Sequence, residues 1–274
     1  MSKKRLDIEV VMNLNVLNKF EPITLDEMSG IRLMNRTDTK FVTTLDKLLT
    51  LLNMAQQDYY VQDMSGNRCI PYYTMYFDTP ERIMYKMHHR GHVGRQKVRI
   101  RSYVNSHLSF LEVKTKDNHG RTRKKRIEIS SFDPRNPDYD IRFHNQDETS
   151  LEHGRFLSKY LFLDPESLEE TLENNFNRIT LVNKAKTERL TIDVNLKFHN
   201  LSTDRNYSLD RLVIIELKRD GLQKSPILGL LNQLRIKPMG FSKYCMGSAL
   251  TSDGDLPLNN FKLRLRTVRK ILNA

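Results

Sequence analysis

Cationic side chains occupy every second position between residues 95 and 101 of this 274-residue chain, as Arg95, Lys97, Arg99 and Arg101. Because successive side chains of a strand point to opposite faces, the pattern predicts a strand with one cationic face, on which neighbouring charges are about 7 Å apart. A solvated surface strand is the simplest alternative, but such a face normally mixes charges of both signs. A row of one sign favours an anionic partner, either a bound ligand or carboxylates on neighbouring strands.

Further predicted strands carry charged faces of the same kind. Strands are expected near 36–42, 72–78, 108–116, 121–130, 175–182, 188–196 and 212–219, with a turn at 117–120 that makes a hairpin. The charged positions on these faces are Lys40, Lys114, Lys124, Arg126, Arg178, Arg189 and Lys218, with Glu112, Glu128, Glu188 and Glu216. In the segment 188–196, Arg189, Thr191 and Asp193 share a face.

Ionic faces on several strands are sensible if the sheet closes into a barrel, with its apolar side against outer helices and its ionic side toward a lumen. Closure would also remove exposed sheet edges. Buried charges are costly unless they are paired or ligated. A cationic lumen with a few carboxylates therefore predicts a polyanion together with a divalent metal, which is the outline of a triphosphate site.

Helices are expected around these strands. Thr44 is placed to cap a helix that ends near Gln56, a capped turn is expected at 24–27, and shorter helices are expected near 79–91, 149–162, 165–172 and 226–234. A helix over about 8–19 and a basic amphipathic helix over about 258–273 flank a single domain of residues 1–274. The basic helix is expected to cover the barrel, although its charge also suits an anionic membrane surface or a membrane-protein partner.

The composition restricts the partner and the compartment. A net charge of +12 and a pI near 9.6 indicate a polyanionic partner: nucleic acid, an anionic membrane or a phosphate-rich substrate. Cys69 and Cys245 are the only cysteines and form no C-x-x-C pair, which fits a reducing compartment. No apolar signal core follows Met1, and no run is long enough to span a bilayer, so a cytoplasmic location is expected.

Several common chemistries lack their sequence signatures. The chain contains no phosphate loop of the G-x-x-x-x-G-K-[ST] type, no G-x-G-x-x-G turn and no G-x-S-x-G elbow. His88, His89 and His92 lie close together but lack the helix-borne glutamate of a zinc hydrolase, so solvent-exposed histidines are the favoured interpretation. The charged strand faces remain as the main candidates for chemistry.

Seven short motifs occur in an order that resembles the bacterial VTC domains, relatives of the polyphosphate polymerase subunit of the yeast vacuolar transporter chaperone complex. They are FEPI (20–23), RLMNRTDTKF (32–41), YFDT (76–79), KVRIRSY (97–103), FLEVK (110–114), IELK (215–218) and FSKYC (241–245). The resemblance covers about residues 20–250. It implies a triphosphate tunnel fold, an α+β antiparallel barrel of about eight strands flanked by helices, which binds ATP and transfers its γ-phosphate to a growing polyphosphate chain with Mn²⁺ or Mg²⁺.

The resemblance also implies roles by position. It assigns Lys40, Arg99, Arg101 and Lys114 to catalysis, Lys124, Arg126, Arg178, Arg189, Lys218, Ser242 and Lys243 to phosphate binding, and Glu216 to the metal. Arg95 and Lys97 are expected at the tunnel mouth. The Glu-x-Glu-x-Lys pattern of many tunnel enzymes reads Arg36-x-Asp38-x-Lys40 here, which fits the VTC branch and weakens a two-metal hydrolase. Phe176 stands in the place of a tyrosine that helps to bind phosphate in the eukaryotic enzyme.

Other interpretations stay open at this point. A triphosphatase of the same fold would use water as the acceptor, and a non-catalytic sensor would bind polyphosphate or nucleotide without turnover. Nucleic-acid binding ranks last, because the cations alternate within strands instead of forming an outward patch with aromatic residues. Lys114 and Lys218 also fit solvated strand lysines, Glu216 a structural salt bridge, and Ser242 a helix cap.

Overall fold

Eleven strands of the described chain form one sheet, which is antiparallel apart from one short pair. The computed structural model describes residues 14–29, 31, 36–118, 121–129, 148–221 and 223–273. The main path of hydrogen-bonded strands is β2 (Arg36–Thr44), β11 (Leu212–Asp220), β9 (Glu188–Asn200), β8 (Glu169–Asn183), β4 (Ile70–Asp78), β5 (Gln96–Tyr103), β6 (Leu108–Lys116) and β7 (Thr122–Ile129). Off this path, β10 (Arg205–Leu209) pairs with β9, β3 (Tyr59–Gln62) with β8, and β1 (Glu21–Ile23) with β3.

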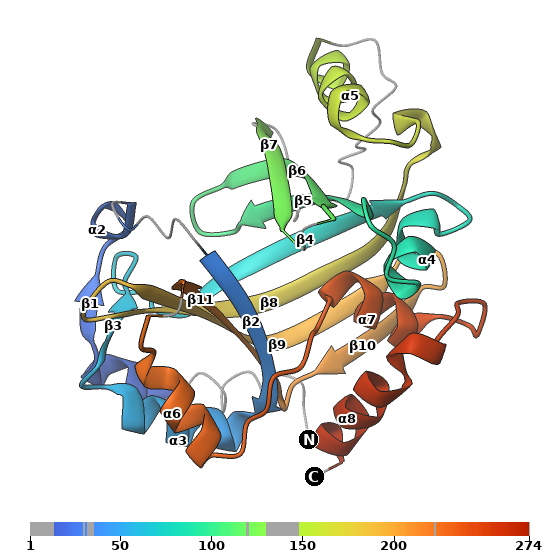
Figure 1. The fold of residues 1–274 in the computed structure, drawn as a ribbon. Helices are drawn as coiled ribbons and strands as arrows, with labels where there is room; N and C mark the ends of the chain where they lie inside the picture. Colours follow the sequence, from blue (N-terminus) through green and yellow to red (C-terminus); the bar gives the residue numbers. More distant parts are fainter. Residues whose placement is uncertain are drawn as a thin grey trace.

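The sheet is strongly curved but open. Figure 1 shows β2 and the β5–β6–β7 part curving toward each other from the two ends of the sheet. Within the described residues β2 and β7 do not pair, although side chains of both reach the same cavity. The predicted α+β class with an antiparallel sheet and flanking helices is confirmed, and the difference from the expected closed barrel lies in this missing ladder. The cationic side chains of β7 are largely exposed, which is typical of a charged strand at a sheet edge.

Alternation places apolar side chains on the outer face of the sheet. Val98 and Ile100 of β5 are fully buried and pack with Leu111 and Val113 of β6. Burial of each such side chain stabilises the fold by about 1.5–3 kcal/mol relative to exposure. Their neighbours in sequence therefore point to the concave side, as the period-two pattern predicts.

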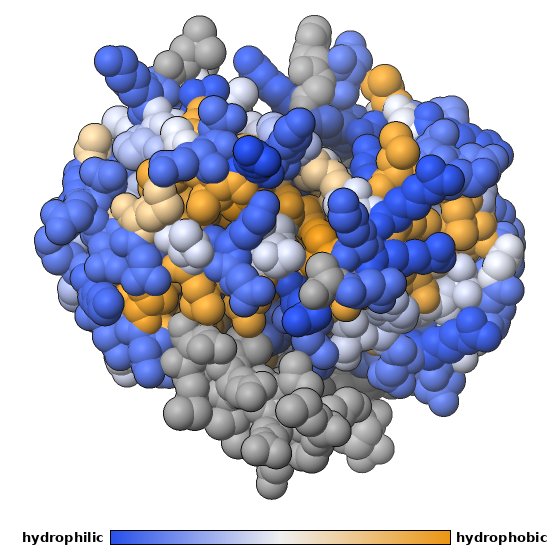
Figure 2. Space-filling view, turned by 90° about the horizontal axis from the view of Figure 1, so that it is seen from below, coloured by the Kyte–Doolittle hydropathy of each residue, from blue (hydrophilic) through white to orange (hydrophobic). Residues whose placement is uncertain are grey.

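Helices cover this outer face at both ends of the sheet, α3 (Leu45–Ala55) at one end and α5 (Glu148–Tyr160) at the other. α3 begins where the Thr44 hydroxyl accepts a hydrogen bond from the Lys47 amide at 3.4 Å, as predicted. It buries leucines against the sheet and contacts α6 (Pro226–Gln233). Figure 2 views the molecule from below, the side on which α3, α6 and α8 (Lys262–Leu272) lie in Figure 1, and hydrophilic side chains divide the apolar areas there into separate patches.

Two short helices hold residues near the concave side. The buried carboxylate of Asp78 accepts hydrogen bonds from the amides of Met84 and Tyr85 at 2.8 and 2.9 Å and so anchors α4 (Ile83–His89). α7 (Lys243–Thr251) packs so closely on the sheet that a Cβ at Gly247 would lie 2.5 Å from the Phe198 ring. The cluster around Tyr85 and Phe261 includes Leu265 and Val268 of α8, so the basic helix is packed onto the fold.

Some predicted elements differ from the structure. The helix predicted over 165–172 is wrong: a single turn, η2 (Pro165–Ser167), precedes β8, because pairing with β4 extends that strand back to Glu169. The predicted helix over 8–19 appears as the 3-10 helix η1 (Leu14–Lys19), and its earlier residues lie outside the described ones. α5 (Glu148–Tyr160) and α2 (Leu25–Ser29), with its Thr24–Glu27 cap, agree with prediction. η3 (Asn259–Phe261) precedes α8. None of the helices in these ranges is long and apolar enough to cross a membrane.

Candidate functional site

A cavity of about 460 Å³ lies on the concave side of the sheet, and its lining is mostly cationic. Nine of its thirteen lining residues are Lys or Arg and two are carboxylates, contributed by strands from both ends of the sheet and by α7. We call it the tunnel cavity. It is lined by Asp38, Lys40, Tyr76, Arg99, Arg101, Lys114, Thr122, Lys124, Arg178, Arg189, Glu216, Lys218 and Lys243.

The structure brings most of the predicted site residues together here. All four residues assigned to catalysis line the cavity, as do Glu216 and five of the seven assigned to phosphate binding. These ten residues therefore lie around one cavity, while the chemical role of each stays a prediction. Arg126 and Ser242 do not line this cavity.

The strand register explains this convergence. Across the β2–β11 pair, Glu216 lies opposite Lys40 and Lys218 opposite Asp38, and across β9–β11 Lys218 lies opposite Arg189. Residues directly opposite each other on an antiparallel pair share a face. Charged residues that are far apart in the sequence therefore form one wall.

Glu112 is the counter-charge of the wall formed by β5, β6 and β7. Its carboxylate is 1% exposed and accepts hydrogen bonds from Arg99 Nε and Nη2 at 2.8 and 2.6 Å, while Lys124 Nζ lies 3.4 Å away. Burial alone raises the pKa of Glu112, but Arg99, Arg101, Lys114 and Lys124 together hold it well below its usual range. The carboxylate is ionised and fixes the orientation of Arg99.

Asp193 is the counter-charge of the opposite wall, formed by β8, β9 and α7. The sequence motifs did not indicate Asp193 as a site residue. Its two oxygens accept hydrogen bonds from Arg178 Nε and Nη2 at 2.6 and 2.8 Å, and Lys243 Nζ also donates to it. Burial raises the pKa of Asp193, whereas Arg178 and Lys243 lower it well below its usual range. The sequence feature that could have indicated Asp193 is its place on the same strand face as Arg189 and Thr191. Asp193 positions two predicted phosphate-binding cations.

Arg101 differs from these paired arginines. Its Nε is buried and has no hydrogen-bond partner among the described residues, and its guanidinium lies 5.8 Å from the centroid of the Tyr72 ring. Burial lowers the pKa of Arg101, and the nearby Arg99 and Arg178 lower it further. An arginine remains charged even so. Arg101 therefore provides a positive charge and a hydrogen-bond donor for an anion.

Glu216 is the candidate metal ligand. Although burial raises its pKa, Lys40, Lys218 and Arg178 lower it to about 2, so the carboxylate is ionised. Lys218 Nζ lies 3.9 Å from Glu216 Oε2. In the described ranges no three His, Cys, Asp or Glu side chains gather as a protein-only metal site. One ionised carboxylate in a cationic cavity fits Mg²⁺ or Mn²⁺, which commonly take one or two carboxylates and complete their shell with phosphate oxygens and water.

Arg126, Ser242 and Phe176 do not line the tunnel cavity, although the sequence motifs associate these positions with phosphate binding. Arg126 is exposed, with its guanidinium 4.4 Å from the centroid of the Phe110 ring. The Ser242 hydroxyl caps α7 by accepting a hydrogen bond from the Cys245 amide at 3.2 Å, which is the alternative noted from the sequence. Phe176 lacks the tyrosine hydroxyl but lies 4.0 Å from Lys243 Nζ, measured to its ring centroid, so it retains a cation–π contact.

A cationic cavity on the concave side of an antiparallel sheet with flanking helices is the arrangement that the sequence motifs predict for this chain. The family model for the VTC domain matches residues 35–252, most of the chain. The chain therefore belongs to the VTC domain family, as its motifs indicate. No curated protein matches the chain.

Similar solved structures come from a bacterium, a plant and an archaeon. A putative adenylate cyclase of Vibrio parahaemolyticus is 12% identical with a TM-score of 0.43, covering 78% of this chain and 99% of that one. A putative adenylyl cyclase of Hippeastrum, described as having a dominant triphosphatase activity, is 14% identical with a TM-score of 0.45, covering 82% and 99%. A conserved hypothetical protein of Pyrococcus furiosus is 17% identical with a TM-score of 0.38, covering 74% and 91%. At these values they support no inference about activity.

Proposed function

We propose that the tunnel cavity binds the triphosphate of ATP and transfers its γ-phosphoryl group to the end of an inorganic polyphosphate chain. The observation that carries the proposal is the ring of nine cations around one cavity of about 460 Å³, with ionised Glu216 among them. Buried cations at this density need an anion of several charges, and a phosphate chain supplies oxygens on every side.

The transfer requires little covalent help from the protein. The bond between the γ-phosphorus and its bridging oxygen to the β-phosphate breaks, ADP leaves, and a terminal phosphate oxygen of the chain forms the new P–O bond. This nucleophile is already anionic, which fits a cavity whose thirteen lining residues include neither histidine nor cysteine. Arg99, held by Glu112, and Arg101 are placed to stabilise negative charge on the transferring group.

A divalent cation belongs to this proposal. Glu216 would hold Mn²⁺ or Mg²⁺ beside Lys40 and Lys218. When bound, such an ion neutralises charge on the phosphate oxygens.

Hydrolysis of the same bond by water is the second candidate. Lys243 favours it, because burial lowers the pKa of its ammonium group to about 7 although Asp193 raises it. An amine that is partly neutral at pH 7 can accept a proton from water. In that case the same cations would serve a triphosphatase.

The experiment is an incubation of the purified protein with ATP and MnCl₂, followed by separation of products by length on a gel. The proposal expects long phosphate chains and ADP, and expects Glu216→Gln to abolish them. Orthophosphate or pyrophosphate alone would support hydrolysis and refute the polymerase. Binding of ATP without any product would support a sensor instead.

A further inference from the structure

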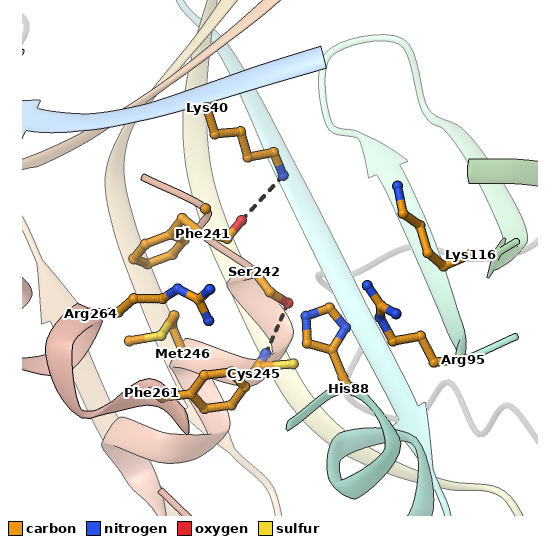
Figure 3. A pocket seen from close by; sticks show the side chains of 11 residues that line it. Lys40, His88, Arg95, Lys116, Phe241, Ser242, Cys245, Met246, Phe261 and Arg264 are labelled. Carbon is orange, nitrogen blue, oxygen red and sulfur yellow. Dashed lines mark hydrogen bonds between the residues drawn. The ribbon is translucent and has the colours of Figure 1, made fainter. Parts of the chain in front are cut away.

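A second cavity of about 290 Å³ adjoins the tunnel cavity and shares Lys40 with it. We call it the side pocket. Its walls come from β2, α4, α7 and α8, from the loop before β5 and from the end of β6. Figure 3 shows Lys40 and Phe241 above Ser242, with Arg264 on one side and His88, Arg95 and Lys116 on the other.

The charge of the side pocket has one sign. Lys40, Arg95, Lys116 and Arg264 are among its eleven lining residues, and none of the eleven is a carboxylate. The tunnel cavity differs, because Asp38 and Glu216 line it. The side pocket therefore suits an anion that enters without a divalent metal.

His88 is a half-buried, uncharged residue of the side pocket. Burial lowers its pKa to about 2, assisted by Lys97, Arg95, Arg264 and Lys40, so the imidazole is neutral at physiological pH. Its Nδ1 is buried and has no hydrogen-bond partner among the described residues. The neutral imidazole therefore offers the cations of the side pocket no counter-charge.

Ser242 adds a hydrogen-bond donor to the wall of the side pocket. Its oxygen accepts hydrogen bonds from Lys97 Nζ at 2.8 Å and from the Cys245 amide at 3.2 Å. A hydroxyl that accepts two hydrogen bonds can still donate its own proton. Lys40 lines both cavities, and its Nζ donates a hydrogen bond to the Phe241 carbonyl at 3.2 Å.

We propose that the side pocket binds phosphoryl groups of inorganic polyphosphate, so that a chain longer than a triphosphate spans both cavities past Lys40. Under the proposed function, on which the catalytic part of this inference rests, these groups belong to the acceptor chain. An uncharged nucleobase could contact the apolar floor at Phe261 and Met246, but it would leave the charges of Arg95 and Arg264 without an anion. A linear phosphate chain neutralises them.

The test compares two ligands by isothermal titration calorimetry in EDTA, so that no metal and no turnover are involved. Wild-type protein, Arg264→Gln and Arg266→Gln are titrated with long-chain inorganic polyphosphate and with tripolyphosphate. Arg266 is the matched control, because it is an exposed cation of the same helix that does not line the side pocket. Loss of one charge-assisted contact corresponds to about tenfold weaker binding.

The expected result is that Arg264→Gln weakens binding of the long chain about tenfold and leaves tripolyphosphate nearly unchanged, while the control changes neither. Lys116→Gln, at the end of β6, is a second variant in case Arg264→Gln folds poorly, and it should also weaken binding of the long chain alone. Equal weakening of both ligands, or equal behaviour of Arg264→Gln and the control, would overturn the proposal. In a parallel titration, weakening of ATP alone would overturn it and place the nucleoside in the pocket. A protein that forms no polyphosphate but shows the expected pattern would refute only the proposed transfer.

Discussion

Replacement of Asp193 by Asn tests whether one buried carboxylate holds a wall of the tunnel together. Asp193 accepts two hydrogen bonds from Arg178 and one from Lys243, and all three side chains are largely buried. Removing one partner of a buried ion pair costs about 3–5 kcal/mol, because the other charge loses its compensation. Asn keeps an oxygen that can accept from Arg178, so the lower end applies, about 3 kcal/mol of unfolding free energy.

The assay is urea denaturation at pH 7, with and without tripolyphosphate. Asp193→Asn should lower the unfolding free energy, and tripolyphosphate should restore more of it in the variant than it adds to wild type, because the anion replaces the missing charge. Asp204→Asn is the control, since that carboxylate is 92% exposed. An Asp193→Asn protein as stable as wild type would refute the proposed role of Asp193. Equal stabilisation of both proteins by tripolyphosphate would refute the link between this wall and anion binding.

Three further predictions follow from the same contacts. Arg101→Ala should reduce turnover about 10²–10³-fold, whereas Arg95→Ala should mainly change long-chain affinity and its salt dependence in steady-state assays; equal effects would contradict the placement of the two arginines. Burial lowers the pKa of Lys243 to about 7 and of Lys97 to about 8, so the unfolded chain binds more protons above these values. The free energy of unfolding without ligand should therefore rise with pH from about 7 toward 10, while the affinity for metal-free tripolyphosphate falls. Urea denaturation and calorimetry measure the two quantities, and no change of either with pH over this range would contradict the prediction. Gly247→Ala should cost about 1–3 kcal/mol in urea denaturation, because the new methyl group meets an aromatic ring of β9; unchanged stability would mean that α7 can shift freely.

The sequence was sufficient for features that depend on local period. Alternation in 95–101 and 108–116 correctly predicted which side chains share a face, with Val98, Ile100, Leu111 and Val113 on the apolar one, because a strand has only two faces. Thr44 correctly marked the start of α3, since the cap is made within one turn. Ten predicted site residues meet at the tunnel cavity, which the family motifs made predictable.

Features that depend on long-range pairing could not be predicted in the same way. Asp193 became a counter-ion only because the register brings Arg178 of β8 and Lys243 of α7 to it. The segment 165–172 was predicted to be a helix, but pairing with β4, far away in the sequence, extends β8 back to Glu169. The openness of the sheet depends on backbone pairing between its two ends, which side-chain alternation does not determine.

Glu112 and Asp193 are two buried carboxylates that offset part of the positive charge around the tunnel cavity in the absence of a ligand. Glu112 and Asp193 each pin one arginine in a bidentate or forked geometry on opposite walls. Cations still outnumber carboxylates among the residues that line the cavity, and Arg101 keeps a buried donor that no described residue accepts from. Part of the positive charge is thus used to fix geometry and the rest remains for an anion. Side chains that are held in place before a ligand arrives are what the proposed phosphoryl transfer requires, because preorganised charges stabilise a transition state without being rearranged during the reaction.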